Sequence, residues 1–418
     1  MKISSCISAL FFLLLSGISS RAQQLSINQV KEIILKNHSS LRMYDSEAEA
    51  MDAAAKGAWS WMPTEVGTGF FMMPYNPKYT RQTDMGEGMG QYSIALQQML
   101  PNKKKQTAEY SYMSAMSTVV KEKKQATLNE LIADAKKNYY EWVVIKKKLE
   151  VIKENEKLLE FMVKDAEIRY KNGLEKLGAY YKAKAAFGNI QSMRLMFEND
   201  MRLRRINLNT LMNRDKETSF DVDTTLLIKD LINAGEVSLA LVNSRSDLKA
   251  IDRDIQLTFL QQELERVRLK PEIGFRYEHM FGFGGQPLQY TAMAMVRIPF
   301  TSWASRMNKA NIESLRLRRE SLGFERQMRI NELSGMASGM QTEADTKRRQ
   351  LKLYEENIIP ALKNNYKVMQ LGYGQNTEEL FELYDAWESL NMTQLEYLDQ
   401  LQQFLTLRVE LERILEIK

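Results

Sequence analysis

Residues 61–67 read Trp-Met-Pro-Thr-Glu-Val-Gly, and residues 269–274 read Leu-Lys-Pro-Glu-Ile-Gly. The same order recurs around both stretches. Met-Leu-Pro at 99–101 is followed later by Arg-Ile-Pro at 297–299, and Arg-Tyr-Lys-Asn-Gly at 169–173 by Gln-Leu-Gly-Tyr-Gly at 370–374. Because the order is kept, we infer that one unit was duplicated. Its period of about 200 residues is much longer than the roughly 20–50 residues of a solenoid repeat. Each copy is therefore a whole supersecondary assembly.

Long helices are predicted in both copies. No proline lies between Pro101 and Pro271, and the stretch is rich in Lys, Glu, Leu, Met and Ala, which favour helix. Apolar residues recur every three or four positions there and near the C-terminus, which indicates coiled-coil packing. We expect glycine to supply the left-handed residue where each helix breaks, at Gly173 and within residues 372–374. Pro360 is predicted to kink its helix.

Two pairs of short segments precede the predicted helical hairpins. Residues 66–73, 91–100, 272–280 and 290–298 alternate apolar and polar side chains or carry aromatic residues at their ends. Alternation over about ten residues is typical of transmembrane β-strands. Four strands cannot close a barrel, and an open edge is not stable in lipid. Three chains would supply twelve strands, an even number within the known range of barrels.

The sequence predicts an α+β membrane protein built from duplicated strand-loop-strand units, each followed by a long helical hairpin. Residues 1–22 are expected to be a signal peptide, and they contain the only cysteine, Cys6. The first repeat is predicted at 23–213, with its hairpin from about 102. A linker follows at 214–236. The second repeat is predicted at 237–418, with its hairpin from about 304.

Composition argues against several other classes. Charged residues make up 27% and hydrophobic residues 44% of the 418 residues, which fits neither a disordered chain nor a polytopic helical membrane protein. The net charge of +5 is spread out, without the basic-aromatic cluster expected for nucleic-acid binding. His38 and His279 are the only histidines, and no phosphate loop, zinc spacing or nucleophile elbow is present. We therefore expect neither an enzyme nor a bound cofactor or metal.

The ordered motifs resemble the TolC-type outer membrane efflux protein family. The opening residues 25–37, the strand-to-helix junctions at 99–101 and 297–300 and the turn at 169–174 carry this resemblance. It implies a homotrimer whose twelve-stranded β-barrel lies in outer membrane lipid on a periplasmic coiled-coil α-barrel. It also implies a passive exit duct that works with a periplasmic adaptor and an inner-membrane pump. The family usually has Asp six residues after the turn glycine, whereas Ala179 and Leu380 occupy those positions here.

Two groups of residues near the hairpin turns are candidate sites. Acidic residues repeated by threefold symmetry could form a cation-attracting ring at the pore entrance, although such residues are equally typical of a solvated helix face. These candidates are Glu378, Glu379, Glu382, Asp385 and, in the first copy, Glu175. The turns themselves are candidates for docking the adaptor. They contain Asn172, Gly173, Leu174, Gly372, Gly374 and Asn376.

Methionine is abundant, with 25 residues, and many of them flank the predicted strands. Thioethers are soft ligands suited to Cu(I), which raises the possibility of a copper or silver efflux duct. The alternative is that Met fills irregular apolar or lipid-facing surfaces. These strand-flanking residues are Met62, Met72, Met73, Met85, Met89, Met99, Met280, Met293 and Met295. Two further alternatives are a duct for secreted polypeptides in a type I system and a structural coiled-coil surface protein.

Overall fold

The computed structural model describes residues 23–82, 86–224 and 245–417. The expected signal peptide, Met85 and residues 225–236 of the expected linker lie outside these ranges. The chain forms two compact units, each of which combines segments from both halves of the sequence. We call them the helical unit (23–42, 127–224 and 332–417) and the strand unit (43–82, 86–126 and 245–331). The helices α4 and α8 contribute residues to both.

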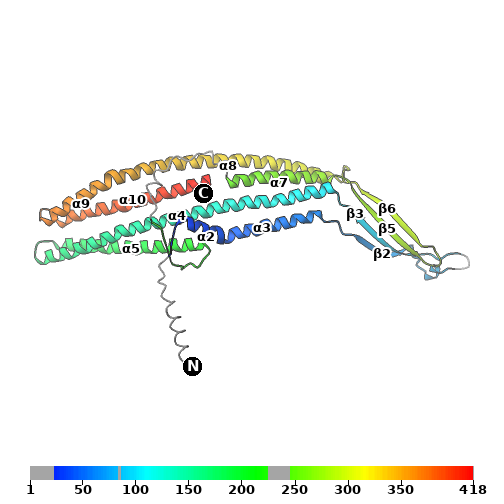
Figure 1. Ribbon diagram of the computed structural model, residues 1–418, viewed down its shortest axis with the longest axis horizontal. Coiled ribbons are helices and arrows are strands. Elements are labelled where there is room, and N and C mark those ends of the chain that lie inside the picture. Colours follow the sequence, from blue (N-terminus) through cyan, green and yellow to red (C-terminus); the bar gives the residue numbers. More distant parts are fainter. Residues whose placement is uncertain (1–22, 83–85, 225–244, 418) are drawn as a thin grey trace, which may run out of the picture. The chain divides into compact units, whose positions relative to one another are not determined.

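The elements follow one another along the chain as labelled in Figure 1. In the first half they are β1 (Gln23–Leu25), α2 (Ile27–Asn37), α3 (Ser39–Ala55), β2 (Glu65–Phe71), β3 (Gln91–Met99), α4 (Lys103–Lys171), α5 (Leu177–Leu211) and β4 (Phe220–Val222). In the second half they are α7 (Ser246–Arg268), β5 (Glu272–Gly282), β6 (Gln289–Arg297), α8 (Arg306–Leu353), α9 (Ile359–Gly374) and α10 (Leu380–Leu415). At 1.5 Å per residue, the 69 residues of α4 extend for roughly 100 Å along the helix axis.

The helical unit is held together by apolar side chains from four helices. Buried residues of α4, α5, α9 and α10 form one cluster near the hairpin turns, including Ile152, Leu159, Ile190 and Trp387. A second cluster packs the parallel pair β1–β4 against α4. There the buried Tyr139 hydroxyl donates to the carbonyls of Leu25 (3.1 Å) and Asp223 (3.0 Å).

Buried amides interrupt this apolar seam between α4 and α10. The Asn155 side-chain amide donates to Asn391 Oδ1 (2.7 Å), and Trp387 Nε1 donates to Asn155 Oδ1 (2.6 Å). A polar pair inside a helical seam favours one register, because any other alignment leaves the amides without partners. The two hairpins are therefore aligned axially, which fixes the relative level of their turns.

A π-helical turn, Tyr354–Ile358, lies between α8 and α9, and Pro360 is the second residue of α9. Proline has no N–H to donate and its ring crowds the carbonyl four residues earlier, so a regular α-helix cannot pass through it unchanged. The structure accommodates the residue with one widened turn.

The strand unit contains an antiparallel sheet in the order β2-β3-β5-β6. Directly paired residues on neighbouring strands share a face, and the register therefore assigns every strand residue to one of two faces. One face carries exposed apolar side chains: Val66, Phe70, Ile94, Leu96, Ile273, Phe275, Tyr277, Phe281, Tyr290 and Val296. The other carries mainly polar groups and methionines, together with the exposed Phe71: Glu65, Gln91, Gln97, Glu272, Arg276, Glu278, Gln289, Thr291, Arg297, Met99, Met280, Met293 and Met295.

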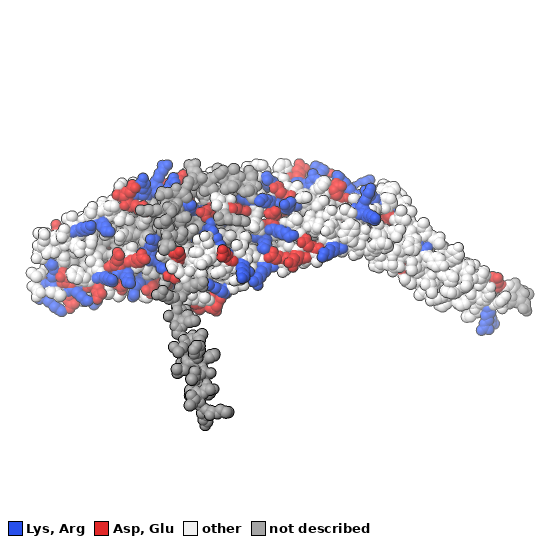
Figure 2. Space-filling model, viewed as in Figure 1, with Lys and Arg blue, Asp and Glu red and all other residues white. Residues whose placement is uncertain are grey.

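The apolar face is unusual for a surface in water, since most of its side chains are apolar and exposed. Figure 2 shows few charged groups over the strands, whereas both signs of charge are frequent over the helices. None of the described helices combines the length and the apolar composition needed to cross a membrane.

Candidate functional site

The helix α4 ends in a Schellman arrangement that forms the first turn (residues 172–176). The Gly173 N–H donates to the Tyr170 carbonyl (3.0 Å) and the Leu174 N–H to the Arg169 carbonyl (2.9 Å). Gly173 has a φ of 71°, a conformation that costs an L-residue with a side chain roughly 1–2 kcal/mol. No atom lies within 4 Å of the position that a Cβ would take. Glycine is thus required here by backbone conformation and not by lack of space.

The second turn (residues 375–379) has the same hydrogen-bond pattern. The Asn376 N–H donates to the Tyr373 carbonyl (3.1 Å) and the Thr377 N–H to the Gly372 carbonyl (2.9 Å). The expectation that glycine supplies the left-handed residue is wrong here, because Gly372 and Gly374 lie in the last turn of α9. Asn376 takes that conformation, with a φ of 60°. Asparagine tolerates it because its short polar side chain can bond locally.

Four side chains link the two hairpins next to the turns, and we call them the tip network: Asp165, Arg169, Tyr373 and Asn376. Arg169 Nη1 donates to Asn376 Oδ1 (2.8 Å), and Arg169 Nε pairs with Asp165 Oδ2 (3.0 Å). The Tyr373 hydroxyl donates to the same Asp165 oxygen. The Arg169 guanidinium also lies over the Tyr373 ring, 4.2 Å from its centroid. Asp165 therefore accepts bonds from both hairpins.

Burial raises the pKa of the Tyr373 phenol, and its hydrogen bond to the Asp165 carboxylate raises that pKa further. The phenol consequently stays protonated and remains a donor at any physiological pH. The arrangement is a charge-assisted link, the stronger class of protein hydrogen bond.

The predicted acidic residues lie on the second turn and on the first turns of α10. Glu379, Glu382 and Asp385 are exposed, and Glu378 is half-buried. The hydrogen bond between the Glu378 and Glu382 carboxyls, and the repulsion between their charges, raise the pKa of Glu378. Glu379 faces Lys176 of the first turn at 3.8 Å. The structure therefore brings Glu378 and Glu382 together, while Glu175 caps the Lys176 N–H (3.0 Å) on the other hairpin.

Large apolar side chains are exposed around both turns. Leu174 is 73% exposed at the first turn, and Leu371 is 66% and Phe381 58% exposed beside the second. Lys182 Nζ lies 3.7 Å from the centroid of the Phe381 ring and 4.3 Å from that of Tyr384. Exposed apolar groups gathered at one place on a folded chain are typical of a protein-protein contact.

Among the described residues, no group of three or more His, Cys, Asp or Glu side chains is arranged to hold a metal ion. The methionines on the strands do not fit the lipid-facing alternative. Met99, Met280, Met293 and Met295 all lie on the polar face of the sheet. Met99 and Met295 flank Gly274 across neighbouring strands, and the Met99 sulfur covers that glycine.

Sequence reasoning missed three of the four residues in the tip network. Arg169 and Tyr373 were present in the quoted motifs but were read only as markers of the repeat, and Asp165 was not singled out. Their importance lies in contacts between residues about 200 positions apart, which helical periodicity cannot report because it describes one helix at a time.

No protein-family model matches the sequence, and neither does any curated protein sequence. Solved structures do match. A crystal structure of CusC has a TM-score of 0.75 at 13% identity, covering 93% of this chain and 91% of that one. The outer membrane protein VceC of Vibrio cholerae gives 0.72 at 15%, covering 93% and 95%. The outer membrane channel CmeC of Campylobacter jejuni gives 0.71 at 13%, covering 93% and 85%. The chain thus has the fold of outer membrane efflux channels, which confirms at the level of fold the resemblance drawn from the sequence.

Proposed function

We propose that this protein belongs to the TolC-type family and is the outer membrane exit duct of a tripartite efflux system. The observation that carries the proposal is the two-faced sheet. Its apolar face suits hydrocarbon and its polar face suits a water-filled channel, as the two faces of a transmembrane barrel require. If the sheet were surrounded by water, the exposed Val66, Leu96 and Tyr277 would favour aggregation.

Closure of the barrel requires further copies of the chain. In the described sheet, β2 and β6 each have a partner on one side only. An unpaired edge leaves backbone N–H and C=O groups without partners, which lipid cannot supply. Pairing β2 of one copy with β6 of the next would satisfy both edges. Three copies give twelve strands, which agrees with the homotrimer implied by the sequence resemblance.

Transport through such a duct would be passive. The polar face lines the passage, and the helical hairpins continue it into the periplasm. Glu382 lies six residues after Asn376, which is the left-handed residue of the second turn. The family resemblance implies an acidic residue at this distance from the turn. Threefold repetition of Glu378, Glu382 and Asp385 would give a ring that favours cations. The tip network holds the two hairpins together at this entrance.

The partners would be a periplasmic adaptor and an inner-membrane pump. The exposed Leu174 and the neighbouring turn residues Asn172 and Gly173 support adaptor docking at the first turn. The changes Leu174→Asp and Leu195→Asp form a matched pair, because both leucines are exposed but Leu195 lies along α5, away from the turn. Docking predicts that only Leu174→Asp abolishes efflux at unchanged yield of the assembled protein.

The direct test of the function is growth of a deletion strain, with and without the restored gene, on dyes, detergents, antibiotics and metal salts. We expect the deletion to sensitise cells to such compounds and the restored gene to reverse this. Unchanged growth on the entire panel, with the protein shown to be expressed in the parent, would contradict an efflux role.

A copper or silver duct is a second candidate, favoured by one observation. Four methionines lie on the face that would line the passage, where thioethers can contact a soft cation. Replacing Met293 and Met295 with Leu keeps volume and removes the soft ligands. Loss of silver and copper tolerance with intact dye efflux would support this candidate. The control is Met196→Leu on α5, and equal tolerance in both variants would refute it.

A further inference from the structure

The polar face of the sheet carries every Lys, Arg, Asp and Glu side chain of the strands β2, β3, β5 and β6. The register places all of them on that face and none on the apolar one. They are Glu65, Glu272, Arg276, Glu278 and Arg297. A charge on the lipid-facing side of a barrel is costly, most of all at the middle of the membrane. This distribution supports the polar face as the lining of the passage.

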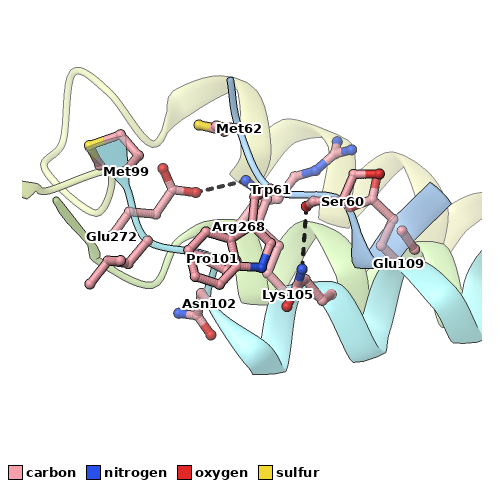
Figure 3. A pocket seen from close by; sticks show the side chains of 13 residues that line it. Ser60, Trp61, Met62, Met99, Pro101, Asn102, Lys105, Glu109, Arg268 and Glu272 are labelled. Carbon is pink, nitrogen blue, oxygen red and sulfur yellow. Dashed lines mark hydrogen bonds and ion pairs between the residues drawn. The ribbon is translucent and has the colours of Figure 1, made fainter. Parts of the chain in front are cut away.

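Three of these charges lie at the end of the sheet that adjoins the helices. Glu65 and Glu272 are the first residues of β2 and β5, and Arg297 is the last residue of β6. Glu272 lines a cavity of about 330 Å³ at this end (Figure 3). It lies 2.7 Å from Lys105 of α4 and 3.1 Å from Arg297. These ion pairs have a structural role, because they tie β5 to β6 and to the start of α4.

Arg276 and Glu278 differ from the other three because they lie in the middle of β5. Arg276 Nη2 donates to Glu278 Oε2 at 2.9 Å, and the Ser93 hydroxyl bonds to the same carboxylate. The ion pair itself lies within one strand, so it joins no two elements. Arg276 Nε is buried and has no hydrogen-bond partner among the described residues. A pair that served stability alone would be expected to satisfy this donor.

Small side chains surround this ion pair on the polar face. Glu278 lies directly between Ala95 of β3 and Thr291 of β6, and Gly67 of β2 is the next residue in the same row. Both charged side chains reach the surface of the face, where Arg276 is 36% and Glu278 14% exposed. In the proposed duct, three copies of the chain would place three such pairs at one level of the passage.

We propose that Arg276 and Glu278 form a charge-balanced filter in the barrel section of the duct. A fixed charge in a narrow passage concentrates ions of the opposite sign. Opposite charges 2.9 Å apart largely cancel at a distance, because their potentials subtract. The barrel section then favours neither sign, and the preference for cations is left to the acidic residues at the entrance. The inference rests on the proposed function, since it requires the polar face to line the passage.

Reversal potentials of the assembled full-length protein, recorded in planar bilayers under a KCl gradient, test the filter. Glu278→Gln leaves Arg276 uncompensated and should lower the preference for cations several-fold, whereas Arg276→Gln should raise it several-fold. The double variant Arg276→Gln/Glu278→Gln should return to the wild-type value. The matched controls are Glu160→Gln and Lys164→Gln, which break an exposed ion pair of 2.9 Å on α4 and should leave the reversal potential unchanged.

A second experiment leaves the ion pair intact and probes the same level of the sheet. Thr291→Cys lies opposite Glu278 on the polar face, and Ala292→Cys lies next to it on the apolar face. A positively charged thiol reagent should lower the cation preference of Thr291→Cys, and a negatively charged reagent should raise it. Neither reagent should change Ala292→Cys. The mature chain expected after residue 22 offers the reagents no other thiol.

Several results would overturn the filter. Unchanged reversal potentials in both single variants would mean that the pair does not act on passing ions. Shifts of the same sign, or a double variant that does not return to the wild-type value, would mean that the changes act through the structure of the barrel. If the single variants fail to insert, Thr291→Cys decides, and its insensitivity to both reagents refutes the filter. A wild-type protein that never conducts refutes the proposed function itself.

Discussion

The two hairpin turns have the same backbone, but their side chains differ in charge at two equivalent positions. Both end their helix with the same pair of hydrogen bonds and one left-handed residue, Gly173 in the first and Asn376 in the second. The first is followed by Lys176 and Lys182, whereas the second is followed by Glu379 and Asp385 at the equivalent positions. Backbone hydrogen bonding therefore fixes the shape of a turn, while the side chains remain free to specialise.

The two turns also differ in the side chains that they expose. The first turn presents an exposed apolar residue, Leu174, and the second presents the acidic residues. The tip network joins them through Asp165 and Arg169 on one hairpin and Tyr373 and Asn376 on the other. Separating the hairpins to widen the entrance would require these bonds to break.

The largest effect is expected from Asp165→Ala, which removes the acceptor shared by Arg169 and Tyr373. A hydrogen bond to a charged group contributes about 1.5–3 kcal/mol, and 1.4 kcal/mol is about a tenfold change in an equilibrium. The open fraction of the channel should therefore rise about tenfold or more, measured as resting conductance in planar bilayers. The control is Glu167→Ala, whose carboxylate forms an ion pair with Lys171 of the same helix at 2.7 Å. Equal conductance of the two variants would contradict the role of the tip network.

The next effect distinguishes the glycines of the two turns. Gly173→Ala should destabilise the first turn by roughly 1–2 kcal/mol, because φ there is positive. Gly374→Ala should be neutral or stabilise α9 by up to about 1 kcal/mol, since this helical glycine has open space beside it. Thermal unfolding of each variant and hydrogen exchange of its turn would measure the difference. Equal destabilisation by both changes would show that the turns are not built as described.

A smaller effect concerns ion preference. Neutralising Glu378, Glu379, Glu382 and Asp385 together should lower the preference for cations several-fold, because the ring would lose its negative potential. Glu175→Gln on the first turn should change it much less. Reversal potentials under a salt gradient measure the cation preference of both variants. An unchanged reversal potential in the fourfold variant would indicate that these acids form only a solvated helix face and do not set ion preference.

The smallest effect is a pH dependence at the second turn. The neighbouring Glu382 raises the pKa of Glu378, so Glu378 gains its proton above the ordinary value of 4.5. The folded form then binds more protons than the unfolded one, and the turn becomes more stable as pH falls from neutral through that raised pKa. Cation preference should start to fall in the same window. Glu382→Gln should move the onset to lower pH, and an onset that does not move would rule out the pairing.

Much of this architecture follows from sequence patterns, and the exceptions have physical reasons. The strands predicted at 91–100 and 290–298 lie at Gln91–Met99 and Gln289–Arg297. The second turn was misplaced by two residues because Gly374 was aligned with Gly173, although Asn376 can also adopt a positive φ. The sequence shows which residues of the turn can adopt a positive φ, but it does not determine which of them does so.

The methionines show what a simple pattern could have revealed. Met293 and Met295 alternate with Ala292, Ala294 and Val296, so their common face was readable from a period of two. Whether this common face is the apolar or the polar face of the sheet depends on the pairing of β6 with β5, in which Met293 lies opposite Arg276. The alternation of side chains along one strand does not predict which distant strand pairs with it. The contacts of the tip network escaped prediction for the same reason.

In the proposed duct, neighbouring copies close the sheet by joining β2 of one chain to β6 of the next. The mature chain expected after residue 22 has no cysteine, so any disulfide that forms must join two engineered cysteines. Gly67→Cys on β2 would be combined with single cysteines placed in turn from Tyr290 to Val296 on β6. Oxidation in membranes should give a ladder that ends at three chains, strongest at every second position. No cross-links at any position, or a ladder that continues beyond three chains, would contradict the closed trimeric duct.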